Sequence, residues 1–230
     1  MEAVFAENLT SQHSIIQLSP SEVNHCRVRR MQDRDPVIVL NGKGLACLGM
    51  IVLDEEYHTI SVQCKQFKEM YGESMLHSTV LLGWLDHKER LEFALEKCTE
   101  LGVKRFILSQ TRFSSKKKPD IERLRDKVLS AIKQCKRSIL PEILITHSLA
   151  EALHHLNDTR LIVADPQGST DVSFPHPLCV CIGPEGGFSE EEREEMRSHM
   201  SGCSFLSLGK RRLRAETAAI ATSALLLHNS

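Results

Sequence analysis

The sequence lacks several features that would place it in a specialised class of protein. No apolar run approaches the ~20 residues that a membrane-spanning helix needs. The first residues, MEAVFAENLT, lack the basic and apolar regions of a secretory signal. Low-complexity tracts and internal repeats are also missing. These absences favour a globular protein of the cytoplasm with no membrane contact.

Metal-binding and disulfide patterns are missing as well. The eight cysteines are scattered, mostly within apolar segments, and none forms a C-x-x-C motif. Cys179 and Cys181 are too close in sequence to be a tetrahedral zinc pair, and the eleven histidines have no metal-ligand spacing. We therefore expect free, buried thiols in a reducing compartment and no metal site.

Aromatic residues are scarce and the overall charge is nearly balanced. With one Trp and two Tyr, we expect little stacking of nucleic-acid bases on aromatic side chains. The net charge of -1 does not indicate any particular class of binding partner. The distribution of charge is more informative, because residues 112–137 contain ten Lys and Arg against three acids. This asymmetry indicates either a polyanion-binding face or a solvated, lysine-rich helix.

The hydrophobic pattern changes near residue 70. Before it, short β-type runs alternate with turn signals, and Asn41-Gly42-Lys43-Gly44 is typical of a hairpin turn. Ser19-Pro20-Ser21-Glu22 predicts a capped helix between strands. We expect a small β-barrel or sandwich over residues 1–68 and a linker over 68–75. Its predicted strands are IIQL (15–18), PVIVL (36–40), LACLGMIVL (45–53) and TISVQC (59–64).

From residue 75 to 230, near-continuous apolar runs alternate with helical patterns. This alternation predicts an α/β domain with a parallel sheet covered on both faces. The predicted strands are 79–85, 105–110, 142–146, 160–165, 178–183 and 203–209; the predicted helices are 88–102, about 121–135, 148–156, from Ser189, and 216–228.

Two loops follow strands of this sheet, where α/β proteins bind ligands. The first is GPEGGF (183–188), followed by Ser189 and Glu192 at capping-box spacing; the second is GKRRLRAET (209–217). Glycines there let a ligand reach the backbone. Neither a G-x-G-x-x-G motif nor a P-loop occurs, so the loops lack the known phosphate-binding patterns. The negative charge of Glu185 would repel a phosphate, and we therefore expect a pocket that tolerates a cation. A plain tight turn remains an alternative for the first loop.

Taken together, the two loops resemble a known family. IGPEGGFSEEE followed by LSLGKRRLRAETAAIA resembles the C-terminal signature of the SPOUT methyltransferases, in particular the RsmE type, which methylates N3 of a uridine in 16S ribosomal RNA. KERLEFALEKCTELGV and QCKRSILPEI are similar to two further blocks of that family. NHCRVRRMQDRDPVIVLNGKG is similar to its RNA-binding barrel, a PUA-like domain. The resemblance covers nearly the whole chain.

The resemblance implies a fold, a cofactor and partners. The fold would be a SPOUT-type α/β sheet with a C-terminal deep trefoil knot, over residues 75–230, plus an N-terminal PUA-like β-barrel, over residues 1–68. The cofactor would be S-adenosylmethionine. The partners would be 16S rRNA within the small ribosomal subunit and a second copy of the chain, with the final helix at the dimer interface.

Site residues follow from the same motifs. Arg214 and Glu216 are the catalytic candidates, because a guanidinium can stabilise charge on the uracil oxygens and a carboxylate can accept the N3 proton. Each also has a simpler explanation, as a phosphate or subunit contact and as a helix cap. The expected cofactor contacts are Gly183, Pro184, Glu185, Gly186, Leu206, Leu208, Gly209, Leu213, Thr217 and Ala218. The expected RNA contacts are His25, Arg27, Arg29, Arg30, Arg112, Lys116, Lys117, Lys118 and Arg137.

The chain departs from the family pattern at several positions. Arg212 stands where the family has an apolar residue, Lys133 where it has Glu, and Arg29 where it has Leu. QTRFSSKKK is a looser version of the family's basic Arg-Ser motif. These departures leave target selection less defined than methyl transfer. The sequence therefore predicts uridine-N3 methylation of 16S rRNA, with a ribose 2′-O or tRNA methyltransferase and a non-enzymatic ribosome-assembly factor as alternatives.

Overall fold

The structure, a computed structural model, describes residues 1–54, 56, 58–156, 158–173 and 177–228. The chain forms two compact units. Unit 1 contains Met1–Ser74 and Leu129–Leu140, and unit 2 contains Met75–Val128 and Pro141–Ser230. The smaller unit thus includes a segment that is remote in sequence.

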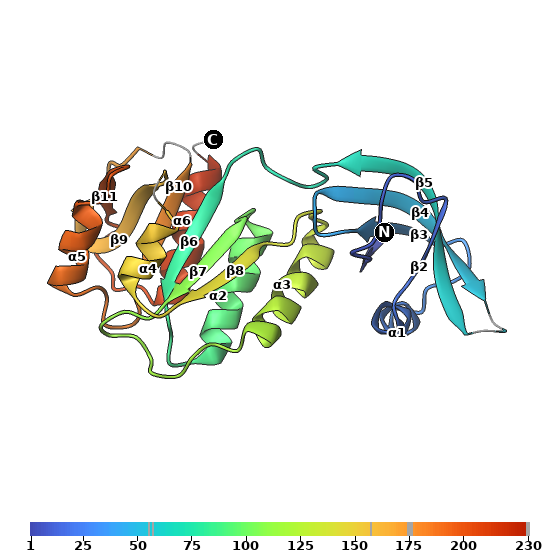
Figure 1. The fold of residues 1–230 in the computed structure, drawn as a ribbon, viewed down its shortest axis with the longest axis horizontal. Helices are drawn as coiled ribbons and strands as arrows, with labels where there is room; N and C mark the ends of the chain where they lie inside the picture. Colours follow the sequence, from blue (N-terminus) through green and yellow to red (C-terminus); the bar gives the residue numbers. More distant parts are fainter. Residues whose placement is uncertain (55, 57, 157, 174–176, 229–230) are drawn as a thin grey trace. The chain divides into compact units, whose positions relative to one another are not determined.

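Unit 1 is built on a five-stranded sheet with the order β1-β3-β4-β5-β2 (Figure 1). β1 pairs in parallel with β3, and the other neighbours are antiparallel. Its elements are β1 (Glu2–Phe5), β2 (Ile15–Gln17), α1 (Pro20–Val28), β3 (Pro36–Leu40), β4 (Leu45–Asp54) and β5 (Thr59–Glu69). The four strands predicted from the apolar runs are confirmed. β1 was not predicted, because only two of its four residues are buried and so short a run carries little periodicity.

The local turn and cap signals of unit 1 behave largely as expected. The predicted hairpin joins β3 to β4, with Gly42 at a φ of 74° and the Asn41 Oδ1 accepting hydrogen bonds from the N–H groups of Lys43 and Leu45. Ser19 caps α1 by accepting from the N–H of Glu22 (3.4 Å). The Glu22 carboxylate pairs with Lys133 Nζ at 2.7 Å. Lys133, the departure from the family pattern, therefore has its counter-charge on α1.

Leu129–Leu140 is tied to the rest of unit 1 by hydrogen bonds as well as by that ion pair. The N–H of Leu140 donates to the carbonyl of Gly42 (2.9 Å), and the N–H of Ser138 donates to Tyr71 (2.9 Å). Arg137 donates three hydrogen bonds of 2.9–3.3 Å to the Glu73 carboxylate, which also accepts from the N–H of Ile139. The sequence pattern placed this segment in the C-terminal domain, because such contacts between distant residues leave no periodic signal.

Arg137 requires a correction. We expected it to contact RNA, but its side chain is 3% exposed and that of its partner Glu73 is fully buried. A guanidinium enclosed in this way cannot reach a phosphate, and its charge is compensated inside the protein. Arg137 holds the 129–140 segment in place.

Unit 2 contains a six-stranded, entirely parallel sheet with the order β11-β9-β10-β6-β7-β8 (Figure 1). The predicted α/β class is confirmed. Its elements are β6 (Ser78–Gly83), α2 (Lys88–Glu100), β7 (Arg105–Ser109), α3 (Ile121–Cys135), whose residues from 129 on count with unit 1, β8 (Glu142–Thr146), α4 (Leu149–His154), β9 (Arg160–Ser169), β10 (Leu178–Ile182), α5 (Glu190–Arg197), β11 (Cys203–Leu206) and α6 (Ala215–His228).

Helices cover both faces of the parallel sheet. Alternate strand residues such as Leu81, Val163 and Cys181 form one core with α4 and α5, in agreement with the two-residue period of a strand. On the other face, α6 packs on β6 and β10 and against α2. Because β9 lies between β11 and β10, the carboxyl ends of these three strands are neighbours. The two loops singled out in the sequence leave the sheet at this edge.

Candidate active site

The first loop, Gly183–Phe188, folds tightly back on itself after β10. A Cβ at Gly183 would lie 2.7 Å from the carbonyl carbon of Gly187, and Gly187 has a φ of 74°. Side chains at these positions would clash or strain the backbone. The glycines are therefore needed for the tight conformation of the loop, and they also leave its backbone accessible.

The capping box after this loop is confirmed. Ser189 Oγ accepts from the N–H of Glu192 (3.3 Å), and the N–H of Ser189 donates to Glu192 Oε2 (2.8 Å). A hydrogen bond from its own backbone N–H lowers the pKa of Glu191, as expected in the first turn of α5. The other Glu192 oxygen accepts from the N–H of Arg112 at 2.7 Å, so the cap also fixes the loop after β7.

The second loop runs from the end of β11 to the start of α6. Gly209 has a φ of 103°, a backbone conformation that strains other residues. A Cβ at Gly209 or at Gly187 would meet no atom of the described residues within 4 Å. Both glycines line the cavity described next, and the space beside their backbones is open.

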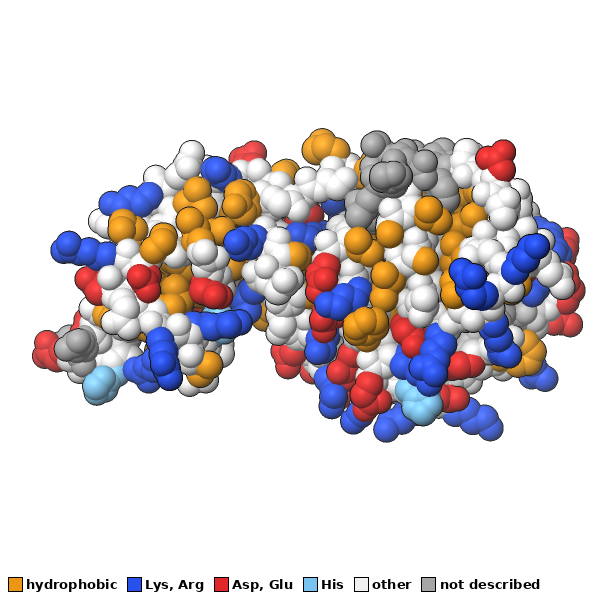
Figure 2. All heavy atoms as spheres, turned by 180° about the vertical axis from the view of Figure 1, so that it is seen from behind, with side chains coloured by type: hydrophobic (Ala, Val, Ile, Leu, Met, Phe, Trp, Pro, Cys, Tyr) orange, Lys and Arg blue, Asp and Glu red, His pale blue; other side chains and the backbone are white. Residues whose placement is uncertain are grey.

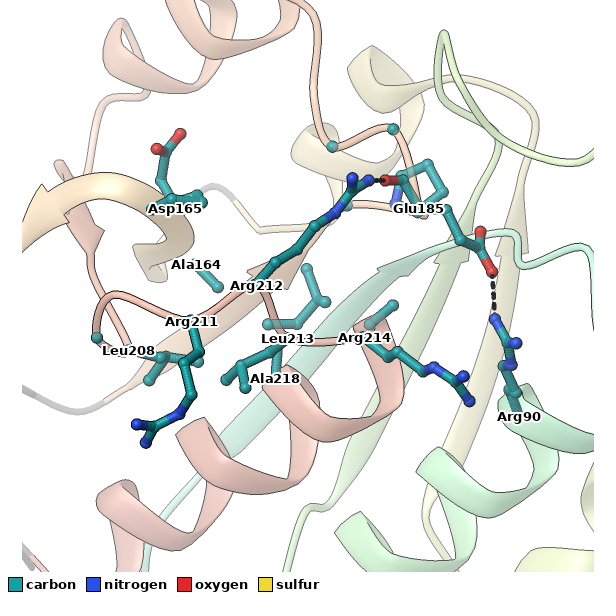
Figure 3. Close-up of a pocket in the computed structure, with 18 of the residues that line it drawn as sticks. Arg90, Ala164, Asp165, Glu185, Leu208, Arg211, Arg212, Leu213, Arg214 and Ala218 are labelled. Carbon is teal, nitrogen blue, oxygen red and sulfur yellow. Dashed lines mark hydrogen bonds and ion pairs between the residues drawn. The ribbon is translucent and has the colours of Figure 1, made fainter.

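The two loops enclose a cavity of about 560 Å³ (Figure 3). This volume is in the usual range for small-molecule sites. It is lined by Arg90, Ala164, Asp165, Pro166, Ile182, Gly183, Pro184, Glu185, Gly186, Gly187, Arg193, Leu208, Gly209, Arg211, Arg212, Leu213, Arg214, Ala215 and Ala218. Leu208, Leu213, Ala164 and Ala218 give it an apolar centre, and charged groups surround them (Figure 3).

Five arginines and two carboxylates line this cavity. Arg193 pairs with the buried Asp165 (3.0 Å), whose other oxygen accepts from the N–H of Gln167 (2.8 Å). Among the described residues, Arg211 and Arg214 form no hydrogen bond or ion pair through their side chains. Glu185, on which the expectation of a cation-tolerant pocket rested, is part of this lining. The lining therefore carries both signs of charge, and Arg211 and Arg214 leave positive charge available to an anionic group of a ligand or an RNA phosphate.

Arg90, on α2, connects the two loops. Its Nη1 lies 3.3 Å from Glu185 Oε1, and its Nε lies 3.8 Å from Glu216 Oε1 (the first pair is drawn in Figure 3). Glu185 belongs to the first loop, and Glu216 to the first turn of α6. One guanidinium thus fixes carboxylates from both halves of the cavity.

Arg212 joins the same two loops in a different way. Its side chain extends toward the first loop, where Nη2 donates to the backbone carbonyl of Glu185 at 2.9 Å (Figure 3). The apolar residue that the family pattern has here could not make this hydrogen bond. The departure noted in the sequence therefore adds a link across the cavity.

Most of the predicted cofactor contacts are brought together. Eight of the ten line the cavity: Gly183, Pro184, Glu185, Gly186, Leu208, Gly209, Leu213 and Ala218. Leu206 is buried in β11 and Thr217 is exposed on α6, and neither belongs to the lining. Of the catalytic candidates, Arg214 lines the cavity, whereas Glu216 is 8% exposed and is not part of the lining described.

Several lining residues were not predicted from the sequence. Ala164, Asp165 and Pro166 come from β9, and Arg193 comes from α5. Asp165 carried a usable signal, because it follows the apolar run LIVA at the carboxyl end of a predicted strand. Arg90 had no such signal, since only the packing of α2 against α6 places it at the cavity.

The remaining RNA candidates are mostly exposed. Arg27, Arg29, Arg30, Arg112, Lys116, Lys117 and Lys118 lie at the surface, and His25 is half-buried. The basic helix α3 also carries counter-charges, since Arg123 pairs with Glu92 and Lys127 with Glu96. Figure 2 shows Lys and Arg side chains interspersed with Asp and Glu on the face it draws. Within the described residues, Arg112, Lys116, Lys117 and Lys118 form no salt bridge, so the Arg112–Lys118 loop carries free basic charge.

All eight cysteines are free; five are buried, and Cys64, Cys135 and Cys203 are half-buried. Within the described residues, no group of three or more His, Cys, Asp and Glu is placed to hold a metal ion. No helix in the described part of the chain is long and apolar enough to cross a membrane.

Comparison with known proteins decides the family. The family model for an RNA methyltransferase domain matches residues 72–227. The chain belongs to this family. The resemblance predicted from the two C-terminal motifs is thereby confirmed, and the chain is a methyltransferase.

Two relatives and one solved structure refine the assignment. Ribosomal RNA small subunit methyltransferase E of Bacillus subtilis is 31% identical over 224 residues, spanning 87% of this chain and 85% of that protein. The protein of the same name from Rickettsia conorii is 29% identical over 228 residues, spanning 94% and 91%. The crystal structure of the Neisseria gonorrhoeae protein of that name, bound to S-adenosyl methionine, has a TM-score of 0.87 and 25% identity, with coverage of 99% and 97%.

Proposed function

We propose that this methyltransferase transfers a methyl group from S-adenosylmethionine to N3 of a uridine in the 16S rRNA of the small ribosomal subunit. The relatives named above support the substrate, since their name refers to small-subunit ribosomal RNA. The similarity to a structure crystallised with S-adenosyl methionine supports the cofactor. Because the substrate is ribosomal, we place the enzyme in the cytoplasm.

The cavity between the two loops carries this proposal. Its volume of about 560 Å³ suits a nucleoside-sized cofactor, and its apolar centre suits an adenine ring. The open space beside Gly187 and Gly209 lets such a ring approach the backbone of both loops without meeting a side chain. When bound, S-adenosylmethionine supplies an electrophilic methyl group on its sulfonium.

The residues around the cavity have separable roles in this proposal. Arg214 lines the cavity and has a free guanidinium, which stabilises the negative charge that develops on the uracil oxygens. Glu185 is the lining carboxylate nearest to Arg90 and is the better placed acceptor for the N3 proton. Glu216, outside the lining described, acts as a positioning residue that holds Arg90.

The finer architecture belongs to the proposal too. We assign unit 1 to a PUA-like RNA-binding barrel and unit 2 to a SPOUT domain with a C-terminal trefoil knot. A homodimer through α6 completes the assembly. RNA contacts come from the exposed basic residues of both units, excluding the buried Arg137. Such contacts go mainly to phosphates, so binding weakens as salt increases.

The test is a methyl-transfer assay with the purified chain, S-adenosylmethionine and either small subunits, free 16S rRNA or tRNA. The RNA is then digested and its nucleosides are identified by mass spectrometry. We expect 3-methyluridine from the small subunit or its rRNA. A product methylated on ribose O2′, or transfer to tRNA alone, would replace the proposed substrate. Calorimetry that detects no S-adenosylmethionine binding would overturn the cofactor assignment.

A further inference from the structure

Phe113 is a large apolar side chain left in an unusual position. It lies in the loop between β7 and α3, and 51% of it is exposed. It follows Arg112 within QTRFSSKKK, the stretch that is a looser version of the family's basic Arg-Ser motif. In a sequence with few aromatic residues, an exposed ring inside the most basic loop needs an explanation.

The backbone around Phe113 is held firmly. The N–H of Thr111 donates to Ser114 Oγ (3.0 Å), and the N–H of Ser114 donates back to the carbonyl of Thr111 (3.1 Å). Arg112 N–H is bound by Glu192, and the N–H of Ser115 donates to the carbonyl of Trp84 (3.0 Å). Binding of a partner to the ring therefore costs little additional entropy for ordering the loop.

Phe113 also lies directly against the first loop, Gly183–Phe188. A Cβ at Gly186 would lie 2.7 Å from Cβ of Phe113 and 3.0 Å from its Cγ. Gly186 lines the cavity between the two loops. The aromatic side chain therefore packs against a residue of the cavity lining.

Free positive charge follows Phe113 closely in the sequence. Lys116, Lys117 and Lys118 are exposed, and within the described residues their side chains form no hydrogen bond or ion pair. An exposed aromatic ring next to unpaired cations is the arrangement with which proteins hold single-stranded nucleic acid: cations bind the phosphates and a base stacks on the ring.

We propose that Phe113 is a stacking platform for a nucleobase that flanks the target uridine. This inference rests on the proposed function, since it requires an RNA substrate at this cavity. Stacking on Phe113 would position the strand while the lysines bind its phosphates. The platform tolerates any base, because every base has a π-face, so it fixes position more than sequence.

The first test compares Phe113→Ala, Phe113→Leu and Phe113→Tyr in methyl transfer to the small subunit. We expect the Ala and Leu variants to raise KM for RNA about 5- to 140-fold, the range that loss of one stacked base gives. Phe113→Tyr retains a π-face and should restore KM. Met200→Ala is the control, because Met200 is 93% exposed and lies outside the cavity lining.

A wild-type KM in Phe113→Leu would overturn the proposal, because leucine keeps apolar volume without a π-face. Affinity for S-adenosylmethionine and thermal stability must stay unchanged for a KM effect to count. If the wild-type protein methylates no RNA, the proposed function has failed, and this result is distinct from a failure of the stacking inference.

A second measurement does not depend on turnover. Trp84 is the single tryptophan and is buried, so Phe113→Trp adds one exposed fluorophore. We expect a single-stranded oligonucleotide with the target sequence to quench the emission of the new tryptophan. The same strand with abasic residues beside the uridine should leave this emission unchanged. Equal quenching by both strands would show phosphate binding alone and would contradict stacking.

Discussion

Arg90 and Glu185, 95 residues apart in sequence, form an ion pair of 3.3 Å at the edge of the cavity. Arg90 comes from α2 and Glu185 from the loop after β10. The same guanidinium lies 3.8 Å from Glu216 on α6. Three elements that meet only in the folded chain are thus connected at the site of the proposed reaction.

Removing this connection should weaken cofactor binding. Arg90→Ala leaves Glu185 and Glu216 without their shared cation, so the first loop loses its fixed position. We expect affinity for S-adenosylmethionine to fall on the order of tenfold, since these groups are partly exposed and solvent screens them. Calorimetry measures the change. Arg125→Ala, which breaks an exposed pair with Glu122 on α3, is the matched control and should bind normally.

Arg212 should affect how fast the cofactor leaves. Arg212→Leu removes the hydrogen bond to the Glu185 carbonyl, which links the two loops. We expect faster dissociation of S-adenosylmethionine in stopped-flow experiments, by a few-fold, as for loss of one charge-assisted hydrogen bond at an exposed site. Arg211→Leu removes the same charge without removing a described hydrogen bond. Equal dissociation rates in the two variants would refute a specific link.

Arg214 and Glu216 should differ in their kinetic signature. Arg214→Ala removes a free guanidinium at the cavity, so we expect kcat to fall about 100-fold with cofactor affinity largely intact. Glu216→Gln should act through Arg90 and weaken cofactor binding more than it lowers kcat. Steady-state kinetics and calorimetry on both variants separate the two effects. Wild-type turnover in Arg214→Ala would exclude its catalytic role.

Arg137 should prove to be structural. Its guanidinium and Glu73 are almost fully buried, so Arg137→Ala leaves an uncompensated buried carboxylate. We expect a loss of about 3–5 kcal/mol in the free energy of unfolding, measured with denaturant. Arg30→Ala, at an exposed position of unit 1, should not destabilise the fold but should weaken RNA binding. If Arg137→Ala kept full stability, the structural role would be wrong.

The buried thiols should be unreactive at about pH 8. Burial raises the pKa of Cys26 to about 11 and that of Cys98 to about 12, from an ordinary value of 9.0. The neutral thiol is a poor nucleophile, so we expect slow labelling by a disulfide reagent in the native protein and rapid labelling after unfolding. In the unfolded chain these thiols ionise at a lower pH than in the folded protein. The free energy of unfolding therefore falls as pH rises from about 9 toward 11. Rapid native labelling of Cys98 would contradict its burial.

The sequence was most informative where structure depends on nearby residues. The Asn41-Gly42 hairpin and the Ser189–Glu192 capping box each form within three or four residues and were confirmed. The alternation of apolar runs predicted the parallel sheet of unit 2 for the same reason, since burial on both faces imposes a local pattern. The two glycine-bearing loops and eight of the ten expected lining residues were also found from the sequence.

Other features were decided by contacts across the fold. Arg137 belongs to the same basic stretch as Lys116, yet one is buried against Glu73 and the other is exposed. The strand order β11-β9-β10 brings Asp165 beside the two loops, and the packing of α2 on α6 brings Arg90 there. No local pattern encodes these neighbours. Turns, caps and strand alternation are short-range, so the amino-acid pattern alone predicted both loops and most helices and strands, although not β1. Burial and charge pairing depend on residues far apart in the chain, so only the folded protein shows which charges face the cavity.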